Sequence, residues 1–158
     1  MSLKSFFAIP FAKQAIKQVY KWANNPHKTQ DKVFKDLISK AKNTAFGKDH
    51  DFKNISSYND FKNRVKVQDY EGLKPYVDRI VEGEEDVLWK GKPIYFAKTS
   101  GTTSGTKYIP ITKESMPTHI KAARNALLFY IAKKNDASFV NGKMIFLQGS
   151  PVLENKNG

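Results

Sequence analysis

The 158-residue chain is 40% hydrophobic and 13% aromatic, so it is long and apolar enough to bury a core in one domain, and an intrinsically disordered segment is excluded. It has no cysteine, which excludes disulfides and cysteine-based metal sites and fits a reducing, cytoplasmic compartment. Its formal net charge of +12 raises nucleic acid and anionic membranes as partners to be tested.

Residues 1–90 are predicted to be mainly helical. Apolar residues recur at helical spacing from Phe11 to Trp22, and the Asn-Asn-Pro sequence at 24–26 ends this pattern. A second helix is predicted at 29–43, with Thr29 as its N-cap. The residues expected to be buried in these two helices are Phe11, Ala12, Ala15, Ile16, Val19, Trp22, Val33, Phe34, Leu37, Ile38 and Ala41.

Shorter elements follow the second helix. Residues 43–50 are predicted to form a loop, after which Ser57 begins a short helix that ends near Arg64. Residues 65–67 are expected to be extended. Asp69 then begins a helix that ends near Gly83, and Pro75 within this helix can shift its start.

Residues 91–158 are predicted as a strand, a polar loop, a strand, a helix and a strand. The strands that flank the loop are 94–97 and 108–111, and the last strand, at 144–147, is expected to be buried on both faces. The helix is predicted to begin at residues 112–115, which places Pro117 in its first turns. The core residues expected in it are Ile120, Ala123, Ala126, Leu127, Tyr130 and Ile131. Strands that alternate with a helix indicate an α/β sheet, of which the chain holds only the beginning.

The polar loop between the two strands is the most informative segment of the chain. It reads Thr-Ser-Gly-Thr-Thr-Ser-Gly-Thr-Lys at 99–107, so hydroxyl groups, backbone amides and one ammonium group can converge on an anion. The P-loop motif is absent, because it needs four residues between its glycines and a Ser or Thr after its lysine. Here three residues separate Gly101 from Gly105, and Tyr108 follows the lysine. No G-x-G-x-x-G sequence occurs, which excludes the dinucleotide fingerprint.

The remaining pattern, T-S-G-T-T-x-G-x-K, resembles the phosphate-binding loop of the adenylate-forming enzymes. Its continuation, Lys-Tyr-Ile-Pro-Ile-Thr at 107–112, is similar to the auxin-responsive acyl-acid amido synthetase family, including its bacterial relatives. Most acyl-CoA ligases have proline before the lysine and glycine after it, where this chain has Thr106 and Tyr108. The resemblance implies that residues 1–158 are the N-terminal part of one large domain, in which a helical region precedes the start of an α/β region. The rest of the parent enzyme is then expected beyond Gly158.

This resemblance implies an ATP-dependent ligase. Such an enzyme uses ATP, with Mg²⁺, to activate a carboxylic acid as an acyl-adenylate, and it transfers the acyl group to an amine, here of an amino acid, to form an amide. The chain alone is expected to be inactive, and the resemblance identifies no catalytic residue within it. The residues that the resemblance implies for binding the phosphates of ATP are Thr99, Ser100, Gly101, Thr102, Thr103, Gly105 and Lys107.

Two other functions remain open from the sequence. The same acyl-adenylate can be passed to coenzyme A as a thioester, and a basic chain can instead be a binding module for RNA or an anionic membrane. Base recognition relies on arginine, but the chain has only Arg64, Arg79 and Arg124, and its lysines are interleaved with acids. We therefore expect a small carboxylic acid and an amine as partners, and neither nucleic acid nor a membrane.

The histidines do not predict a metal site. His27, His50 and His119 lack the spacing of metal ligands, so we interpret them as surface residues. The apolar run at 6–12 is short and is not followed by a small-residue cleavage site, so no secretory signal is expected.

Overall fold

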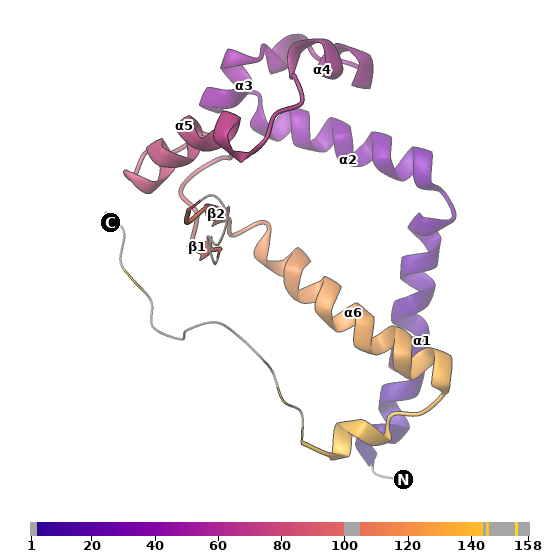
Figure 1. Ribbon diagram of the computed structural model, residues 1–158. Coiled ribbons are helices and arrows are strands. Elements are labelled where there is room, and N and C mark those ends of the chain that lie inside the picture. Colours follow the sequence, from indigo (N-terminus) through magenta and orange to yellow (C-terminus); the bar gives the residue numbers. More distant parts are fainter. Residues whose placement is uncertain (1–2, 100–104, 144, 146–153, 155–158) are drawn as a thin grey trace. The chain divides into compact units, whose positions relative to one another are not determined.

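The computed structural model describes residues 3–99, 105–143, 145 and 154 (Figure 1). The chain divides into two compact units. The helical unit comprises residues 1–29 and 117–153, and the loop-bearing unit comprises residues 30–116 and 154–158. No helix among the described residues is long and apolar enough to cross a membrane.

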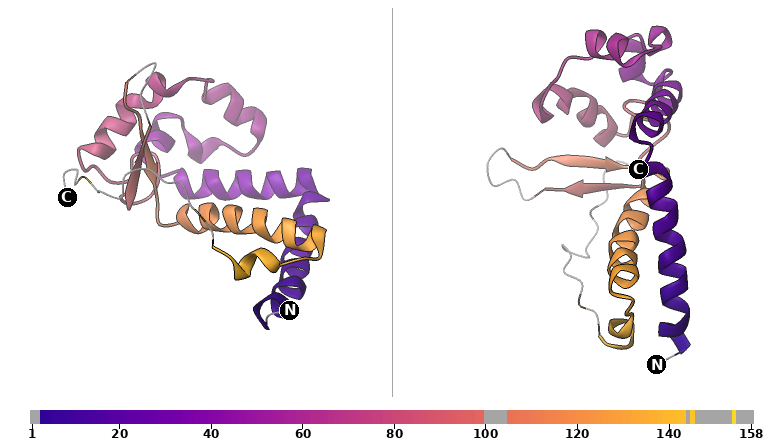
Figure 2. Two further views of the ribbon diagram at one scale, coloured as in Figure 1. Left: turned by 60° about the horizontal axis from the view of Figure 1, so that its bottom comes forward. Right: turned by 90° about the vertical axis from the view of Figure 1, so that its right-hand side faces the viewer.

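The helical unit is built from α1 (Leu3–Ala23), most of α6 (Met116–Lys134) and the 3₁₀ turn η2 (Ser138–Asn141). Helices α1 and α6 lie side by side in the right-hand view of Figure 2. Apolar side chains of both helices are removed from water between them, which is the main stabilising contribution in this unit. The buried residues of this core are Ala12, Ile16, Leu128, Ile131 and Ala137.

Helix α1 is longer than the sequence predicts. It begins at Leu3 instead of Phe11 and passes through Pro10. Ala8 and Ile9 pack against the core, four and three residues before the fully buried Ala12, so the helical spacing of apolar residues continues across the proline. The predicted burial of two residues of this helix is wrong, since Phe11 and Trp22 are 56% and 53% exposed.

The predicted apolar face of α6 is also partly wrong. Ile131 is buried as expected, but Ile120, Leu127 and Tyr130 are exposed, and Leu128 is buried instead. Apolar residues occur on several sides of this helix, so periodicity alone did not identify the side that packs against α1 and η2. The helix begins at Met116, four residues after Thr112, so its predicted start is too early. Residues 112–115 form a turn before the helix, in which the Thr112 and Ser115 amides each donate to the other residue's hydroxyl, at 3.0 and 3.1 Å.

The loop-bearing unit contains most of α2 (Pro26–Ala41), the short helices α3 (Ala45–Asp49), η1 (Phe52–Asn54), α4 (Tyr58–Arg64) and α5 (Tyr70–Val81), and the strands β1 (Tyr95–Lys98) and β2 (Tyr108–Ile111). Aromatic rings surround its core, and several meet edge to face, as Phe46 and Phe52 do with ring centroids 5.8 Å apart. The buried residues of the core are Ile38, Ala41, Phe52 and Ile55, and Phe34, Phe46, Phe61, Val65 and Trp89 pack against them.

Helix α2 begins three residues earlier than predicted. Pro26 is its first residue, a position where proline is favoured because its missing amide hydrogen has no partner in the helix. Thr29 therefore lies inside the helix and is not its N-cap; its hydroxyl donates to the carbonyl oxygen of Trp22 at 3.1 Å. Ile38 and Ala41 are buried as predicted, whereas Val33 and Leu37 are exposed.

The segment at 43–50 was expected to be a loop but contains the helix α3. Thr44, 2% exposed, is its N-cap, and the Thr44 hydroxyl accepts the Gly47 amide at 3.0 Å and donates to the Ala41 carbonyl at 2.7 Å. A Cβ atom at Gly47 would lie 2.1 Å from that same carbonyl oxygen. Only glycine therefore allows the helix to begin so close to the end of α2.

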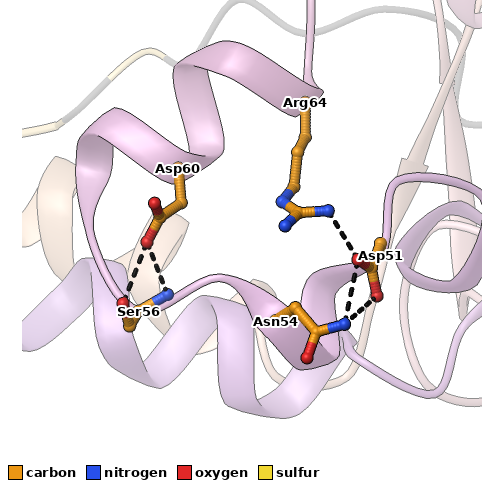
Figure 3. A network of polar contacts seen from close by, with 5 residues as sticks. All are labelled: Asp51, Asn54, Ser56, Asp60 and Arg64. Carbon is orange, nitrogen blue, oxygen red and sulfur yellow. Dashed lines mark hydrogen bonds and ion pairs between the residues drawn. The ribbon is translucent and has the colours of Figure 1, made fainter.

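The predicted start of α4 is confirmed. Ser57 and Asp60 form a capping box: the Asp60 amide donates to the Ser57 hydroxyl at 3.2 Å, and the Ser57 amide donates to the Asp60 carboxylate at 2.9 Å. The Ser56 hydroxyl also donates to Asp60, at 2.9 Å. These contacts, those of Ser56 foremost, lower the pKa of Asp60 from 3.8 to about 2. Figure 3 shows the contacts between Ser56 and Asp60 and, beside them, a second polar cluster in which Arg64 binds Asp51.

Helix α5 is confirmed as well. Asp69 is its N-cap, and its carboxylate accepts the Gly72 amide at 3.2 Å. The helix passes through Pro75, which does not shift its start, and ends just before Gly83, whose φ of +98° favours glycine. Asp69 thus fixes Tyr70 as the first residue of α5.

Strands β1 and β2 form an antiparallel pair, with Tyr95 opposite Ile111, Phe96 opposite Pro110 and Lys98 opposite Tyr108. The predicted strands are confirmed, the first of them shifted by one residue. Among the described residues the sheet has only these two strands, so a larger α/β sheet is not shown. The strand predicted at 144–147 lies outside the described residues except for Ile145, which is 88% exposed and belongs to no strand.

Candidate functional site

The strands β1 and β2 hold the two ends of the predicted phosphate loop together. Beyond the last pair of the ladder, the Thr99 amide donates to the Lys107 carbonyl at 3.0 Å. In return, the Lys107 amide donates to the Thr99 hydroxyl at 3.3 Å. Thr99 and Lys107, the first and last residues of the predicted site, are therefore bonded to each other, and they close the loop at its base.

Three of the predicted phosphate-binding residues are described by the structure, namely Thr99, Gly105 and Lys107. The other four, Ser100, Gly101, Thr102 and Thr103, lie outside the described residues. Gly105 has a φ of +77°, and no atom of the described residues, its chain neighbours left aside, lies within 4 Å of the place where its Cβ would be. Glycine is thus required there for its left-handed backbone conformation and not by close packing.

Tyr70, at the start of α5, contacts the base of the loop. Its hydroxyl accepts the Tyr108 amide at 3.0 Å and lies 3.4 Å from the Tyr108 carbonyl oxygen, to which it donates. The Lys107 ammonium lies 5.3 Å from the centroid of the Tyr70 ring. Such a cation–π contact contributes ~0.5–1 kcal/mol at an exposed site, so it holds the ammonium only weakly.

The sequence did not identify Tyr70, because no spacing rule connects it with a strand that begins 38 residues later. The one local signal is the Asp69 cap, which places the next residue in the first turn of a helix. That signal fixes the position of Tyr70 along the helix but not its partners.

The two lysines at the base of the hairpin have different surroundings. Lys98, at the end of β1, lies 3.7 Å from the Glu154 carboxylate, whereas Lys107 faces an aromatic ring. In the same strand pair, the rings of Phe96 in β1 and Tyr108 in β2 meet edge to face with centroids 6.1 Å apart. The hairpin therefore presents one lysine that is paired with an acid and one that is held by an aromatic face.

Other ionisable residues of the loop-bearing unit make structural contacts. The Arg79 guanidinium binds Glu84 and lowers the pKa of that carboxyl. Partial burial, followed by a hydrogen bond to Asp49, raises the pKa of Tyr76. His50 stacks on Phe46, with its Nδ1 2.9 Å from the Phe46 carbonyl. No group of three potential metal ligands occurs among the described residues.

One cavity of the loop-bearing unit has a volume of about 500 Å³ and combines two lysines, three further polar residues, Trp89 and Glu114. None of the three predicted phosphate-binding residues that the structure describes lines it. Its lining residues are Lys40, Asn43, Thr44, Asp86, Trp89, Lys90 and Glu114.

Comparison with known proteins identifies the family. The profile of the GH3 family N-terminal domain matches residues 15–158, which is most of the chain. The chain therefore belongs to the GH3 family and contains sequence of its N-terminal domain.

Several relatives are similar over part of the chain. The indole-3-acetic acid-amido synthetase GH3.2 of Arabidopsis thaliana is 31% identical over 105 residues, which are 65% of this chain and 19% of the relative. The jasmonoyl-L-amino acid synthetase JAR4 of Nicotiana attenuata is 32% identical over 101 residues, which are 62% of this chain and 17% of the relative. A probable indole-3-acetic acid-amido synthetase of Oryza sativa subsp. japonica, GH3.13, is 45% identical over 58 residues, which are 35% of this chain and 12% of the relative. The chain spans about a fifth or less of the length of these relatives.

Proposed function

We propose that the whole protein is an ATP-dependent ligase that activates a carboxylic acid as an acyl-adenylate and transfers the acyl group to the amine of an amino acid. One observation carries this proposal: a Thr/Ser/Gly/Lys loop, closed at its base by Thr99 and Lys107, in a chain of the GH3 family. The relatives named above are two amido synthetases, one of them probable, and a jasmonoyl-L-amino acid synthetase, and these names support an amide as the product.

The chemistry explains why such a loop is needed. The acid's carboxylate attacks the α-phosphorus of ATP, and pyrophosphate leaves with the electron pair of the bond that breaks. Negative charge on the β- and γ-phosphates must be held while this happens, mainly by positioned donors and positive charge. In this proposal the hydroxyl groups of Ser100, Thr102 and Thr103 are donors, and Gly101 and Gly105 let the backbone approach the phosphates.

Lys107 is the cation of the proposed site. Its ammonium is not in an ion pair with any acid described by the structure; it faces the Tyr70 ring instead. A phosphate can compete with that ring, because a charge-assisted hydrogen bond is stronger than an exposed cation–π contact. The described residues include no cluster that would hold a metal, so we propose that Mg²⁺ enters as its complex with ATP, and no step is assigned to it.

The acceptor is proposed to be an amine and not coenzyme A. Threonine at 106 and tyrosine at 108 replace the proline and glycine that flank the lysine in most acyl-CoA ligases. The adenylate-forming fold of the whole protein, a bacterial type of family member and a cytoplasmic location all remain predictions from the sequence. The alternative interpretation of the +12 net charge is that the protein binds RNA or an anionic membrane.

Pyrophosphate exchange tests the proposed function. The full-length protein is incubated with ATP, labelled pyrophosphate and a panel of aryl and alkyl carboxylic acids. We expect label to enter ATP only when a suitable acid is present, and AMP to accumulate when amino acids are added. Failure of exchange across the panel, or release of ADP and phosphate, would contradict acyl-adenylate chemistry.

A further inference from the structure

Tyr70 contacts two consecutive residues at the base of the loop through two different groups. Its hydroxyl binds the backbone of Tyr108, the first residue of β2, and its ring faces the ammonium of Lys107, the last residue of the loop. All three residues lie in the loop-bearing unit, and Figure 1 shows α5 beside the strand pair. One side chain of a helix thus contacts both the strand and the cation of the proposed phosphate site.

The register of the hairpin explains why the Tyr70 hydroxyl fits at Tyr108. The Thr99 amide donates to the Lys107 carbonyl across the hairpin. Since hydrogen-bonded and non-hydrogen-bonded pairs alternate in an antiparallel ladder, the next pair, Lys98 and Tyr108, is of the second kind. The amide and carbonyl of Tyr108 therefore point away from β1, toward the outer edge of β2, where one hydroxyl both accepts and donates.

The Tyr70 ring forms a cation–π contact with the Lys107 ammonium. The cation lies 5.3 Å from the ring centroid, within the range of an attractive cation–π contact. The contact keeps the positive charge at the base of the loop without neutralising it, as an acidic partner would. A triphosphate that enters the loop would therefore meet a lysine that is already oriented and still positive.

We propose that Tyr70 is the positioning residue of the phosphate loop: its hydroxyl fixes the start of β2, and its ring holds Lys107 ready for a phosphate oxygen. This role rests on the proposed function of the loop. Tyr70 touches neither the acid nor the reacting phosphorus in this proposal and acts only through Tyr108 and Lys107.

The test uses the full-length protein and separates the hydroxyl from the ring. Tyr70→Phe removes the hydroxyl and keeps the ring, and Tyr70→Leu removes both. The matched controls are Tyr76→Phe and Tyr76→Leu, because Tyr76 lies on the same helix, donates its hydroxyl to Asp49 at 2.9 Å and has the Arg79 guanidinium 5.9 Å from its ring. It makes the same kinds of contact, and its partners Asp49 and Arg79 do not belong to the hairpin.

We expect the KM for ATP in pyrophosphate exchange to rise about two- to tenfold in Tyr70→Phe, which loses neutral hydrogen bonds. A further rise of roughly two- to fivefold is expected in Tyr70→Leu, which also loses the cation–π contact. This second rise should vanish when both Tyr70 variants also carry Lys107→Met, because the ring acts through the ammonium. A merely structural loss would give the same second rise with or without Lys107.

Amide hydrogen exchange gives a readout that does not depend on activity. The Tyr108 amide hydrogen should exchange faster than in wild type in Tyr70→Phe. Its exchange rate should equal that of wild type in Tyr76→Phe, provided that the two variants have the same thermal stability. If wild type shows no pyrophosphate exchange, the proposed function fails; Tyr70 is then only a structural contact, and its positioning role is overturned with it. If wild type is active but the Tyr70 and Tyr76 variants behave alike in KM and in Tyr108 exchange, the positioning role alone is overturned.

Discussion

The start of α4 and the base of the hairpin are both held by a side-chain hydroxyl that binds backbone groups, but the distances along the chain differ. At α4 the Ser57 hydroxyl binds an amide three residues away, and at the hairpin the Tyr70 hydroxyl binds an amide 38 residues away. The first arrangement follows from a local pattern and was predicted. The second depends on how α5 packs, and no sequence pattern gave it. The Ser57 contact is thus local and lies at the start of one helix, whereas the Tyr70 contact is long-range and lies at the base of the proposed site.

The largest effect is expected at the loop itself. Thr102→Val with Thr103→Val removes two hydroxyl donors while keeping charge and approximate volume. Each lost hydrogen bond to a charged phosphate should cost ~1.5–3 kcal/mol, or roughly tenfold or more in the rate of adenylation. Pyrophosphate exchange by the full-length protein measures this loss, and unfolding in urea should be unchanged.

The matched control for the loop removes positive charge far along the sequence. Lys133→Gln with Lys134→Gln, in the last turn of α6, should leave adenylation nearly unchanged. A binding module for RNA or membranes would give the reverse pattern, with indifference to the threonines and a shallower salt dependence of binding after loss of the lysines. Neutral threonine variants would show that the loop does not bind the triphosphate.

A smaller effect, on stability alone, is expected at α4. Ser57→Ala removes the N-cap hydroxyl that accepts the Asp60 amide, and loss of such a cap costs ~0.5–2 kcal/mol. The free energy of unfolding in urea measures this change, while the KM for ATP should stay at the wild-type value. Ser39→Ala, on the exposed side of α2, is the control and should be nearly neutral. A changed KM in Ser57→Ala would remove the distinction between the two regions.

The smallest expected effect is a pH dependence of the same cap. Hydrogen bonds from Ser56 and Ser57 lower the pKa of Asp60 from 3.8 to about 2. A carboxyl group whose pKa is lower in the folded chain stabilises the fold above its unfolded pKa, and this contribution is lost as the pH falls through the folded pKa. The free energy of unfolding should therefore decrease between pH 3.8 and about 2.

Urea unfolding followed by circular dichroism at a series of pH values measures this decrease. Asp60→Asn should be less stable than wild type near neutral pH and should lack this part of the acid dependence. An unchanged acid dependence in Asp60→Asn would show that the Ser56 and Ser57 contacts do not stabilise the ionised carboxylate in solution.

Elements with local signals could be predicted from the sequence, and elements that depend on their neighbours could not. The caps at Ser57 and Asp69 predicted α4 and α5, and the apolar runs at 94–97 and 108–111 predicted both strands. The start of α2 at Pro26 was missed, although proline at a first helical position is a known local signal. The buried side of α6 was missed because only contacts with α1 and η2 decide it.

The candidate site shows the same division. The sequence predicted the loop, its two flanking strands and the importance of Lys107. It did not predict that Thr99 and Lys107 bond to each other across the base, nor that Lys107 lies over the Tyr70 ring. Both contacts require the hairpin register and the position of α5, which arise only from packing.

Pro110 in β2 has a consequence for how the hairpin behaves toward other chains. It lies opposite Phe96, two residues from Tyr108, so its nitrogen is on the same outer edge as the Tyr108 amide that binds Tyr70. Proline carries no amide hydrogen, and the Tyr108 amide is already bonded. A strand from another molecule would thus find no amide donor at either position, although Tyr95 and Ile109 expose apolar surface nearby. The outer edge of β2 is protected against the edge-to-edge pairing that leads to aggregation.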